Sequence, residues 1–222
     1  MSDFLAIFTQ YAPLFLEASW VTLRLSAAAI VMAMFLGSLI AAMAMGRVRA
    51  LRWIATAYIG LVRGTPLITQ IFIIYFGLVA IVALPAFWAG ALALAFHNSA
   101  YIAEIIRSGF QAVPSGLTEA ARSLGMSRTK TLKRVQAPLA LRTTLPVLGN
   151  QYIIAIKDSS LVSFIGMTEL FQTSRNVASS TYQELTAYII VALYYLVIVL
   201  ALTAVVNWLE HRLSAHRRPA TS

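Results

Sequence analysis

The sequence predicts an all-α membrane protein with five transmembrane helices in a single domain over residues 1–222. Hydrophobic residues make up 59% of the chain and charged residues only 11%, and the mean hydropathy is +0.77. Soluble domains carry about 25% charged residues, so this composition argues against a water-soluble fold. Apolar segments long enough to cross a bilayer, which takes about 20 residues, alternate with clusters of Lys and Arg. We find no internal repeat and no soluble domain.

The predicted spans cover five apolar segments, which are residues 19–45, 66–84, 85–106, 143–164 and 188–208. In the first, Arg24 lies near one end, where its side chain can reach the headgroups. Residues 51–62 predict an interfacial helix before the second span. That span starts afresh after Arg63-Gly64-Thr65-Pro66, because Pro66 disfavours helix at the residue before it.

The later spans differ in how clearly the sequence defines them. Leu84-Pro85 leaves a very short connection between the second and third spans, which predicts an antiparallel hairpin. The fourth span is interrupted by the polar run Lys157-Asp158-Ser159-Ser160. A polar stretch over residues 167–184 precedes the fifth span and predicts an outer loop with room for a short helix.

Three clusters of Lys and Arg predict the orientation of the chain. They follow the first, third and fifth spans and comprise Arg47, Arg49, Arg52 and Arg63, then residues 107–142, then Arg212, Arg217 and Arg218. With five spans, all three clusters lie on one face, which the positive-inside rule makes cytoplasmic. The N-terminus is then outside and the C-terminus cytoplasmic. Topology explains the net charge of +9, so nucleic acid is not an expected partner.

The connection over residues 107–142 predicts two short helices that meet at Gly125. Ser115 can cap the first helix by accepting hydrogen bonds from backbone N–H groups. An apolar stripe recurs at helical spacing along it, formed by Leu117, Ala120, Ala121 and Leu124. Gly125 suits the left-handed position that ends a helix.

The second short helix is expected to start at Ser127 and to end at Pro138. Leu132 and Val135 would face inward. A rigid helix of small residues can enter a cleft on another protein, and its basic neighbours can meet an acidic rim. Two alternatives remain, a solvated loop whose charges only set topology and a DNA-binding helix-turn-helix. The second is disfavoured because a DNA reader does not ordinarily lie between membrane spans.

These residues also carry a resemblance to a known family. Glu119-Ala120-Ala121, then Gly125 after three residues and Val135-Gln136-Ala137-Pro138 after nine more, resembles the EAA loop of ABC importer permeases. Val135 and Ala137 stand where that loop usually has Ile and Leu. Four further motifs resemble the binding-protein-dependent polar amino acid permeases of the histidine, glutamine and arginine type. They are Arg63-Gly64-Thr65-Pro66-Leu67, Ser99-Ala100-Tyr101-Ile102-Ala103-Glu104, Leu145-Pro146-x-Leu148-Gly149-Asn150 and Lys157-x-Ser159-Ser160-Leu161.

The resemblance implies the type I ABC importer permease fold in the bacterial cytoplasmic membrane. It implies two ATPase subunits, a second permease subunit that is identical or different, and an extracytoplasmic substrate-binding protein. The coupling helix that docks on the ATPase would comprise Glu119, Ala120, Ala121, Leu124 and Gly125. The sequence has no G-x4-G-K-[ST] phosphate loop, so ATP is expected on the partner and no cofactor in this chain.

Polar side chains inside the predicted spans are candidates for a substrate pathway, because such groups are costly in a membrane and usually face a cavity or a partner. They are Gln70, Asn98, Tyr101, Glu104, Lys157, Asp158 and Ser159. Lys157 could bind the carboxylate of an amino acid, and Asp158 its ammonium. The structural alternative is that these two residues cap a broken helix and that Glu104 pairs with Arg107.

The favoured function is therefore a permease for polar amino acids or opines, with Asp158 favouring cationic ones, driven by a separate ATPase. The alternative is a self-contained secondary amino acid carrier or channel. An enzyme is disfavoured, because the chain lacks cysteine, a His-Glu-x2-His metal motif and a Gly-x-Ser-x-Gly elbow. No metal site is expected.

Overall fold

A computed structural model describes residues 2–79, 81–82 and 84–214, and in these residues every regular element is a helix. The α-helices are α1 (Ser2–Met45), α2 (Arg49–Arg63), α3 (Leu67–Val79), α4 (Ala86–Gln111), α5 (Ser115–Ser123), α6 (Arg128–Thr131), α7 (Ala137–Asp158), α8 (Leu170–Thr181) and α9 (Glu184–Ser214). A π-helical turn, η1 (Leu132–Gln136), precedes α7, and a 3₁₀ helix, η2 (Ser159–Ile165), follows it. The all-α prediction is confirmed.

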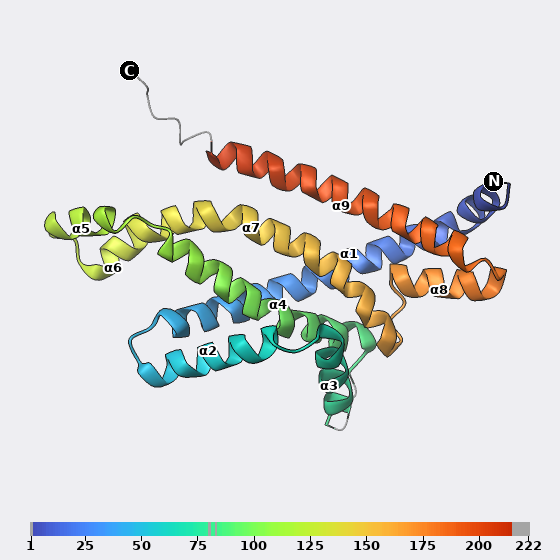
Figure 1. Ribbon diagram of the computed structural model, residues 1–222, viewed down its shortest axis with the longest axis horizontal. Helices are drawn as coiled ribbons and strands as arrows, with labels where there is room; N and C mark the ends of the chain where they lie inside the picture. Colours follow the sequence, from blue (N-terminus) through green and yellow to red (C-terminus); the bar gives the residue numbers. More distant parts are fainter. Residues whose placement is uncertain (1, 80, 83, 215–222) are drawn as a thin grey trace, which may run out of the picture.

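The long helices α1, α4, α7 and α9 run along the long axis of the molecule (Figure 1). The centre is the pair α1 and α4, and α4 also packs against α2, α3 and α7. Gly37 of α1 sits at this crossing, where an added Cβ would lie 2.8 Å from the carbonyl oxygen of Ser99. The small side chain lets the two backbones approach, as is typical of helix pairs in membranes.

The break predicted at residues 63–66 is confirmed, and it bends the chain by 108° between α2 and α3. The buried Gln70 side chain stabilises the bend, because its Nε2 donates to the carbonyl oxygens of Val62 (2.7 Å) and Thr65 (3.1 Å). Of the predicted span 66–84, α3 covers 13 residues, or about 20 Å, which is less than the thickness of a bilayer core. Only together with α2 does this region reach spanning length.

Three helical segments in the described part of the chain are long and apolar enough to cross a membrane, namely Phe4–Met45, Ala86–Gln111 and Glu184–Arg212. The bent pair of α2 and α3 would be a fourth. The first helix begins well before residue 19, and α4 and α9 extend beyond the limits that the sequence predicted. Five spans remain a prediction, in which α7 would be the additional span.

The end of α7 differs from the predicted fourth span. The α-helix stops at Asp158 and continues as η2, so the polar run predicted to interrupt the span coincides with a change of helix type. The short helix expected within residues 167–184 is α8. Of the third basic cluster, Arg217 and Arg218 lie outside the described residues.

Candidate functional site

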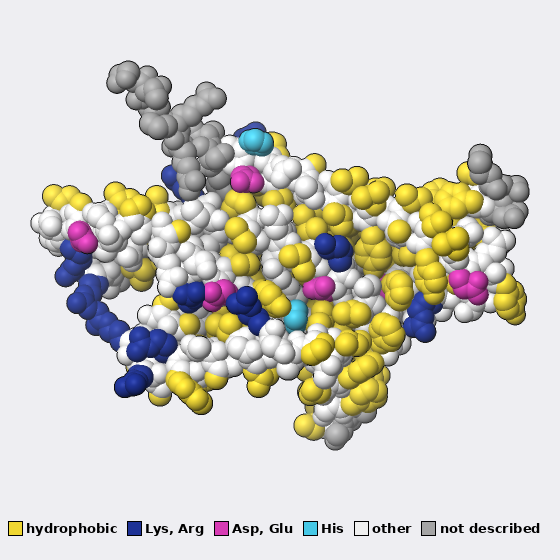
Figure 2. All heavy atoms as spheres, in the orientation of Figure 1, with side chains coloured by type: hydrophobic (Ala, Val, Ile, Leu, Met, Phe, Trp, Pro, Cys, Tyr) yellow, Lys and Arg dark blue, Asp and Glu magenta, His cyan; other side chains and the backbone are white. Residues whose placement is uncertain are grey.

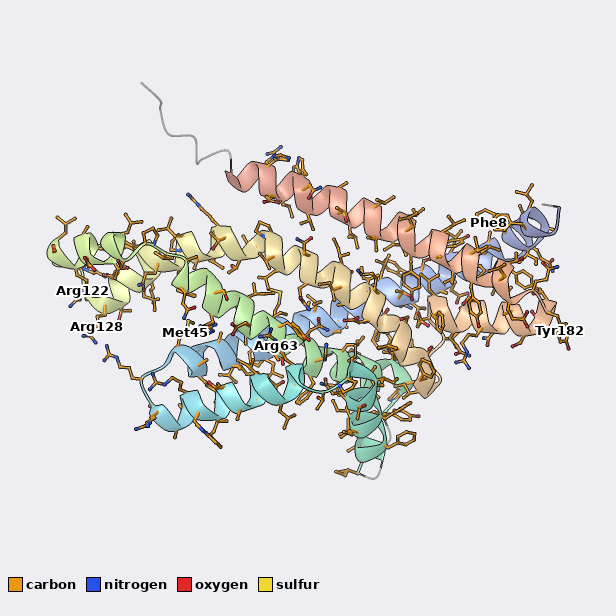
Figure 3. All side chains as sticks on the ribbon, viewed as in Figure 1. Phe8, Met45, Arg63, Arg122, Arg128 and Tyr182 are labelled. Carbon is orange, nitrogen blue, oxygen red and sulfur yellow. The ribbon has the colours of Figure 1, made fainter. Side chains whose placement is uncertain are left out.

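The first candidate site is an elbow formed by residues 115–131, which comprise α5, the turn at Gly125 and α6. It lies at one end of the molecule, far from α8 (Figure 1). Arg122 and Arg128 extend from it (Figure 3). Gly125 has a φ of +79°, which confirms its predicted left-handed position. Its N–H donates to the Arg122 carbonyl (3.0 Å), and the Met126 N–H donates to the Ala121 carbonyl (3.1 Å), so the turn is a Schellman motif.

The start of α5 corrects one expectation. Pro114, in an extended conformation, occupies the N-cap position, and its side chain accepts no hydrogen bond there. Ser115 is already the first helical residue and therefore does not cap the helix as predicted. Proline suits this place because it has no N–H to leave unpaired and its φ of −56° is close to the helical value.

The second helix of the elbow starts as expected, because the Ser127 hydroxyl accepts from the Lys130 N–H at 3.3 Å. Pro138 does not end it, which corrects a second expectation. The chain passes through η1, where the Ala137 N–H donates to the Leu132 carbonyl, and continues into α7. The wider π turn shifts the hydrogen-bond pattern just where proline has no N–H to donate. Leu132 is 44% exposed and does not face inward as predicted, whereas Val135 is half-buried.

The apolar stripe of α5 divides between an inner contact and an outer face. Ala121 is buried, and the Thr118 hydroxyl accepts a hydrogen bond from the Gln136 amide of η1 at 3.1 Å. Leu117, Ala120 and Leu124 are exposed, Leu124 to 85%. Glu119 is also exposed. The elbow therefore holds α5 against the rest of the chain while leaving a small apolar face open to a partner.

The candidates for the substrate pathway do not gather in one place. Three of them, Gln70, Asn98 and Ser159, are buried and form hydrogen bonds within the chain. Gln70 Oε1 lies 2.9 Å from Nδ1 of His97. The Asn98 amide donates to the Leu94 carbonyl (2.8 Å) and accepts from the Gln151 amide (2.8 Å). Gln70 and Asn98 thus join helices, whereas Ser159 donates to the Ile156 carbonyl of its own helical turn, and all three polar groups already have partners.

Two other candidates, Tyr101 and Glu104, line a groove of about 460 Å³ between α4 and α7. Arg63 and Gln151 share its wall. The Arg63 guanidinium carbon lies 5.4 Å from the centre of the Tyr101 ring, within the range of a cation–π contact. Glu104 forms an ion pair with Arg107, as the structural alternative expected. The groove thus presents cationic, anionic, aromatic and amide groups within one space.

The last two candidates end α7, where Lys157 is exposed and Asp158 is half-buried. Neither lines the groove of Tyr101 and Glu104. The helix does end here, as the structural alternative expected, but the Asp158 side chain makes no capping hydrogen bond to η2. Their part in a pathway stays a prediction.

Sequence reasoning missed two residues of the groove, Arg63 and Gln151. Gln151 lies within a predicted span, so the rule that selected Asn98 would also have selected it. Arg63 was assigned to a basic cluster that sets topology. A second hollow of about 760 Å³, between α1 and α8, has Glu17, Arg24 and Asn176 in its lining. From the sequence, Glu17 and Arg24 were interpreted only as charges near the end of a span.

Comparison with known proteins places these features in a family. A family model described as "Binding-protein-dependent transport system inner membrane component" matches residues 33–215. The chain is 37% identical to the "Probable glutamine ABC transporter permease protein GlnM" of Bacillus subtilis (strain 168), over 90% of this chain and 93% of that protein. It is 33% identical to the "Arginine transport system permease protein ArtQ" of the same organism, over 96% and 98%.

A solved structure is similar over almost the whole chain. It is described as "Crystal structure of an amino acid ABC transporter with histidines", and its matching chain is 41% identical to this one. The superposition has a TM-score of 0.90 and covers 95% of this chain and 98% of the other. The overall helical arrangement is therefore one that an experimental structure also contains.

Proposed function

The chain belongs to the family of binding-protein-dependent transport system inner membrane components, and from this membership we propose that it is the permease subunit of an ATP-driven importer of polar amino acids. The named substrates of its relatives, glutamine and arginine, support this class. So does the groove between α4 and α7, because the ammonium and carboxylate of an amino acid need partners of both signs, and the groove is lined by Arg63 and by Glu104, whose carboxylate is paired with Arg107. Cationic amino acids and opines fall within the proposal.

The transporter we propose contains two ATPase subunits that bind ATP, a second permease subunit, identical or different, and a substrate-binding protein outside the membrane. The elbow would face the cytoplasm together with the C-terminus, and the N-terminus would lie outside. This orientation follows from the basic clusters at the end of the molecule that carries the elbow. The hollow beside Glu17 and Arg24 would then open on the outer side, where substrate leaves its binding protein.

The observation that carries the proposal is the exposed face of α5. This helix presents the exposed side chains of Leu117 and Leu124, its end is fixed by the Schellman motif at Gly125, and such a rigid face is suited to burial against a partner protein. The chain has no phosphate loop of its own, so the energy of ATP would have to enter through such a contact. Residues Glu119 to Gly125 are the proposed coupling contact.

Movement of α5 has a contiguous route to the groove. Thr118 of α5 is hydrogen-bonded to Gln136 of η1, and η1 continues directly into α7. Gln151 of α7 lines the groove and is hydrogen-bonded to Asn98 of α4. We propose that closure of the ATPases moves α5 and α7 together and shifts the populations of the states in which the groove opens to one side or the other.

The test of coupling uses Glu119→Lys and Gly125→Pro in the assembled transporter. Proline cannot adopt the φ of +79° at residue 125, so the second change should break the turn. Both variants should insert in the membrane but lose ATPase copurification and uptake. Matched controls are Glu184→Lys, an exposed charge reversal on α9, and Gly60→Ala, at an open position of α2. Normal copurification and uptake by both elbow variants would overturn the assigned contact.

The alternative of a self-contained carrier or channel is separated by reconstitution. Purified chain in liposomes, with and without ATPase and binding protein, is assayed for uptake of labelled glutamine and arginine. We expect uptake only with both partners and ATP. Uptake by the chain alone, driven by an ion gradient, would support the carrier.

A further inference from the structure

A second polar groove, of about 640 Å³, lies where α1 passes into α2. Arg52 and Thr56 of α2 line one side, Arg107 and Gln111 of α4 line the other, and Met45 is at its edge. The two residues on each side are four positions apart in the sequence, so they lie on the same face of their helix. The groove therefore presents two guanidinium groups toward one space.

The charges in this groove are incompletely balanced. Glu104 also lines it, but both Glu104 oxygens are engaged by Arg107. In the described part of the chain, no carboxylate lies within ion-pairing distance of Arg52, and the Gln111 side chain makes no hydrogen bond. Thr56 is not a free donor, because its hydroxyl donates to the Arg52 carbonyl at 2.9 Å. Arg52 and Gln111 can therefore donate to an anion.

The surroundings of the groove distinguish it from an ordinary solvated cluster of arginines. Large apolar side chains are exposed in the same stretch of chain as Arg52, with Val48 57% exposed and Trp53 72% exposed. The space-filling view shows dark blue Lys and Arg next to yellow side chains at this end of α2 (Figure 2). Met45 is also the last residue of a segment long and apolar enough to cross a membrane, so the proposal takes this end of α1 to reach the depth of the lipid headgroups. Tryptophan is enriched at this depth.

We propose that this groove binds the headgroup of an anionic phospholipid. The phosphate would accept hydrogen bonds from Arg52 and Gln111, with Arg47 of the adjoining turn and Arg49 at the start of α2 adding to the attraction. The acyl chains would lie against the exposed apolar side chains of α2, among them Trp53. Basic pockets between membrane helices bind such headgroups by this combination of charge and apolar contact. The apolar flank favours a lipid over an acidic soluble protein. The proposal requires that α1 crosses the membrane and ends near the headgroups. It does not depend on the coupling contact, and it shares Glu104 with the groove between α4 and α7.

The test measures which lipid contacts Trp53. The full chain, with Trp20, Trp88 and Trp208 replaced by Phe, is placed in phosphatidylcholine nanodiscs that contain a minor fraction of brominated lipid. Brominated phosphatidylglycerol should quench Trp53 more strongly than brominated phosphatidylcholine at the same fraction. Arg52→Gln should lower the local enrichment of the anionic lipid, because it removes one of the two guanidinium groups that line the groove.

Two further variants and one condition make the result decisive. Arg52→Lys should keep most of the enrichment because it keeps the charge, and Arg175→Gln, on α8 at the other end of the molecule, should leave it unchanged. High salt should reduce it by screening. Equal quenching by the two brominated lipids in the parent chain would overturn the proposal. If Arg52→Gln left the quenching of Trp53 by both brominated lipids unchanged but lost ATPase copurification, the proposal would also be overturned. That result would assign the groove to a protein partner.

Discussion

At the scale of single residues, small side chains decide how closely the helices pack. Gly37 faces the backbone of α4, where an added Cβ would lie 2.8 Å from the Ser99 carbonyl oxygen and 2.9 Å from Cβ of Ile102. Neither neighbour is the end of a flexible side chain, so the helices themselves would have to move. Gly60, on α2, has open space around the position of a Cβ.

Gly37→Ala should therefore lower the free energy of unfolding by about 1–3 kcal/mol, the usual cost of overpacking. Gly60→Ala is the matched control and should be neutral or stabilising by about 0.5–1 kcal/mol, because alanine favours the helix. Thermal unfolding of the purified protein in detergent measures both changes. Equal stability of the two variants would contradict the close approach of α1 and α4.

Glu169 is the most deeply buried carboxyl group among the described residues and lies between two candidate spans. It accepts hydrogen bonds from the N–H groups of Phe171 (2.9 Å) and Gln172 (2.7 Å), and from the Tyr195 hydroxyl of α9 (2.8 Å). Burial raises its pKa from 4.5 to about 7, although the three hydrogen bonds favour the charged carboxylate and act in the opposite direction. The carboxyl links the start of α8 to α9.

This pKa predicts a pH dependence of stability. Because the folded state binds the proton more tightly than the unfolded chain does, the stabilisation is complete below about pH 4.5 and is lost as the pH rises through about 7. Unfolding temperatures measured across this interval should fall with pH in the parent protein. Glu169→Gln cannot titrate and should remove this slope. A slope that persists in the variant would assign the dependence to another group.

At the scale of elements, α4 and α7 are joined by polar side chains as well as by packing. The Asn98–Gln151 hydrogen bond connects their interiors, and Gly109 brings them together near the groove, where an added Cβ would lie 2.1 Å from Cγ2 of Thr144. Since α7 continues into the elbow, this contact is where a movement of α5 would reach α4.

A double-mutant cycle on Asn98→Ala and Gln151→Ala tests the link. Each single change should destabilise the protein, because it leaves a buried amide without its partner. The coupling energy should be about 0.5–1.5 kcal/mol, as is usual for hydrogen bonds between membrane helices. Unfolding in detergent gives the four stabilities. Strictly additive effects would indicate that the two amides do not interact.

At the scale of the whole molecule, the two ends differ in charge and in shape. The elbow and the α1–α2 corner carry arginines at one end, while α8 covers the other end (Figures 1 and 2). This asymmetry is the basis of the proposed orientation. The sequence contains no cysteine, so single cysteines can report on each end separately.

Single-cysteine variants test the orientation in intact cells. Ser180→Cys, on the exposed side of α8, should react with a membrane-impermeant maleimide added outside. Ser123→Cys, exposed at the end of α5, should react only after the membrane is permeabilised. The permeabilised sample controls for accessibility of each thiol. Reaction of Ser123→Cys from outside would reverse the orientation and remove the coupling contact from the side where ATP is available.

The sequence alone determined the features that depend on neighbouring residues. Helix periodicity, the break at residues 63–66, the left-handed Gly125 and the cap at Ser127 are all local, because glycine, proline and serine act on their own turn of the backbone. The order of the motifs around Glu119-Ala120-Ala121 likewise indicated the family. Local rules were insufficient at Pro138, since a π turn allowed the helix to continue.

Only the tertiary structure decided what each polar side chain is used for. Gln70, Asn98 and Glu104 looked alike as polar groups in apolar helices, but one holds a bend, one joins α4 to α7 and one lines a groove. The partner of Asn98 is 53 residues away in the chain, and no local pattern indicates that distance. The physical reason is that a buried hydrogen-bonding group takes its role from the partner that packing brings within about 3 Å, and packing depends on the whole fold.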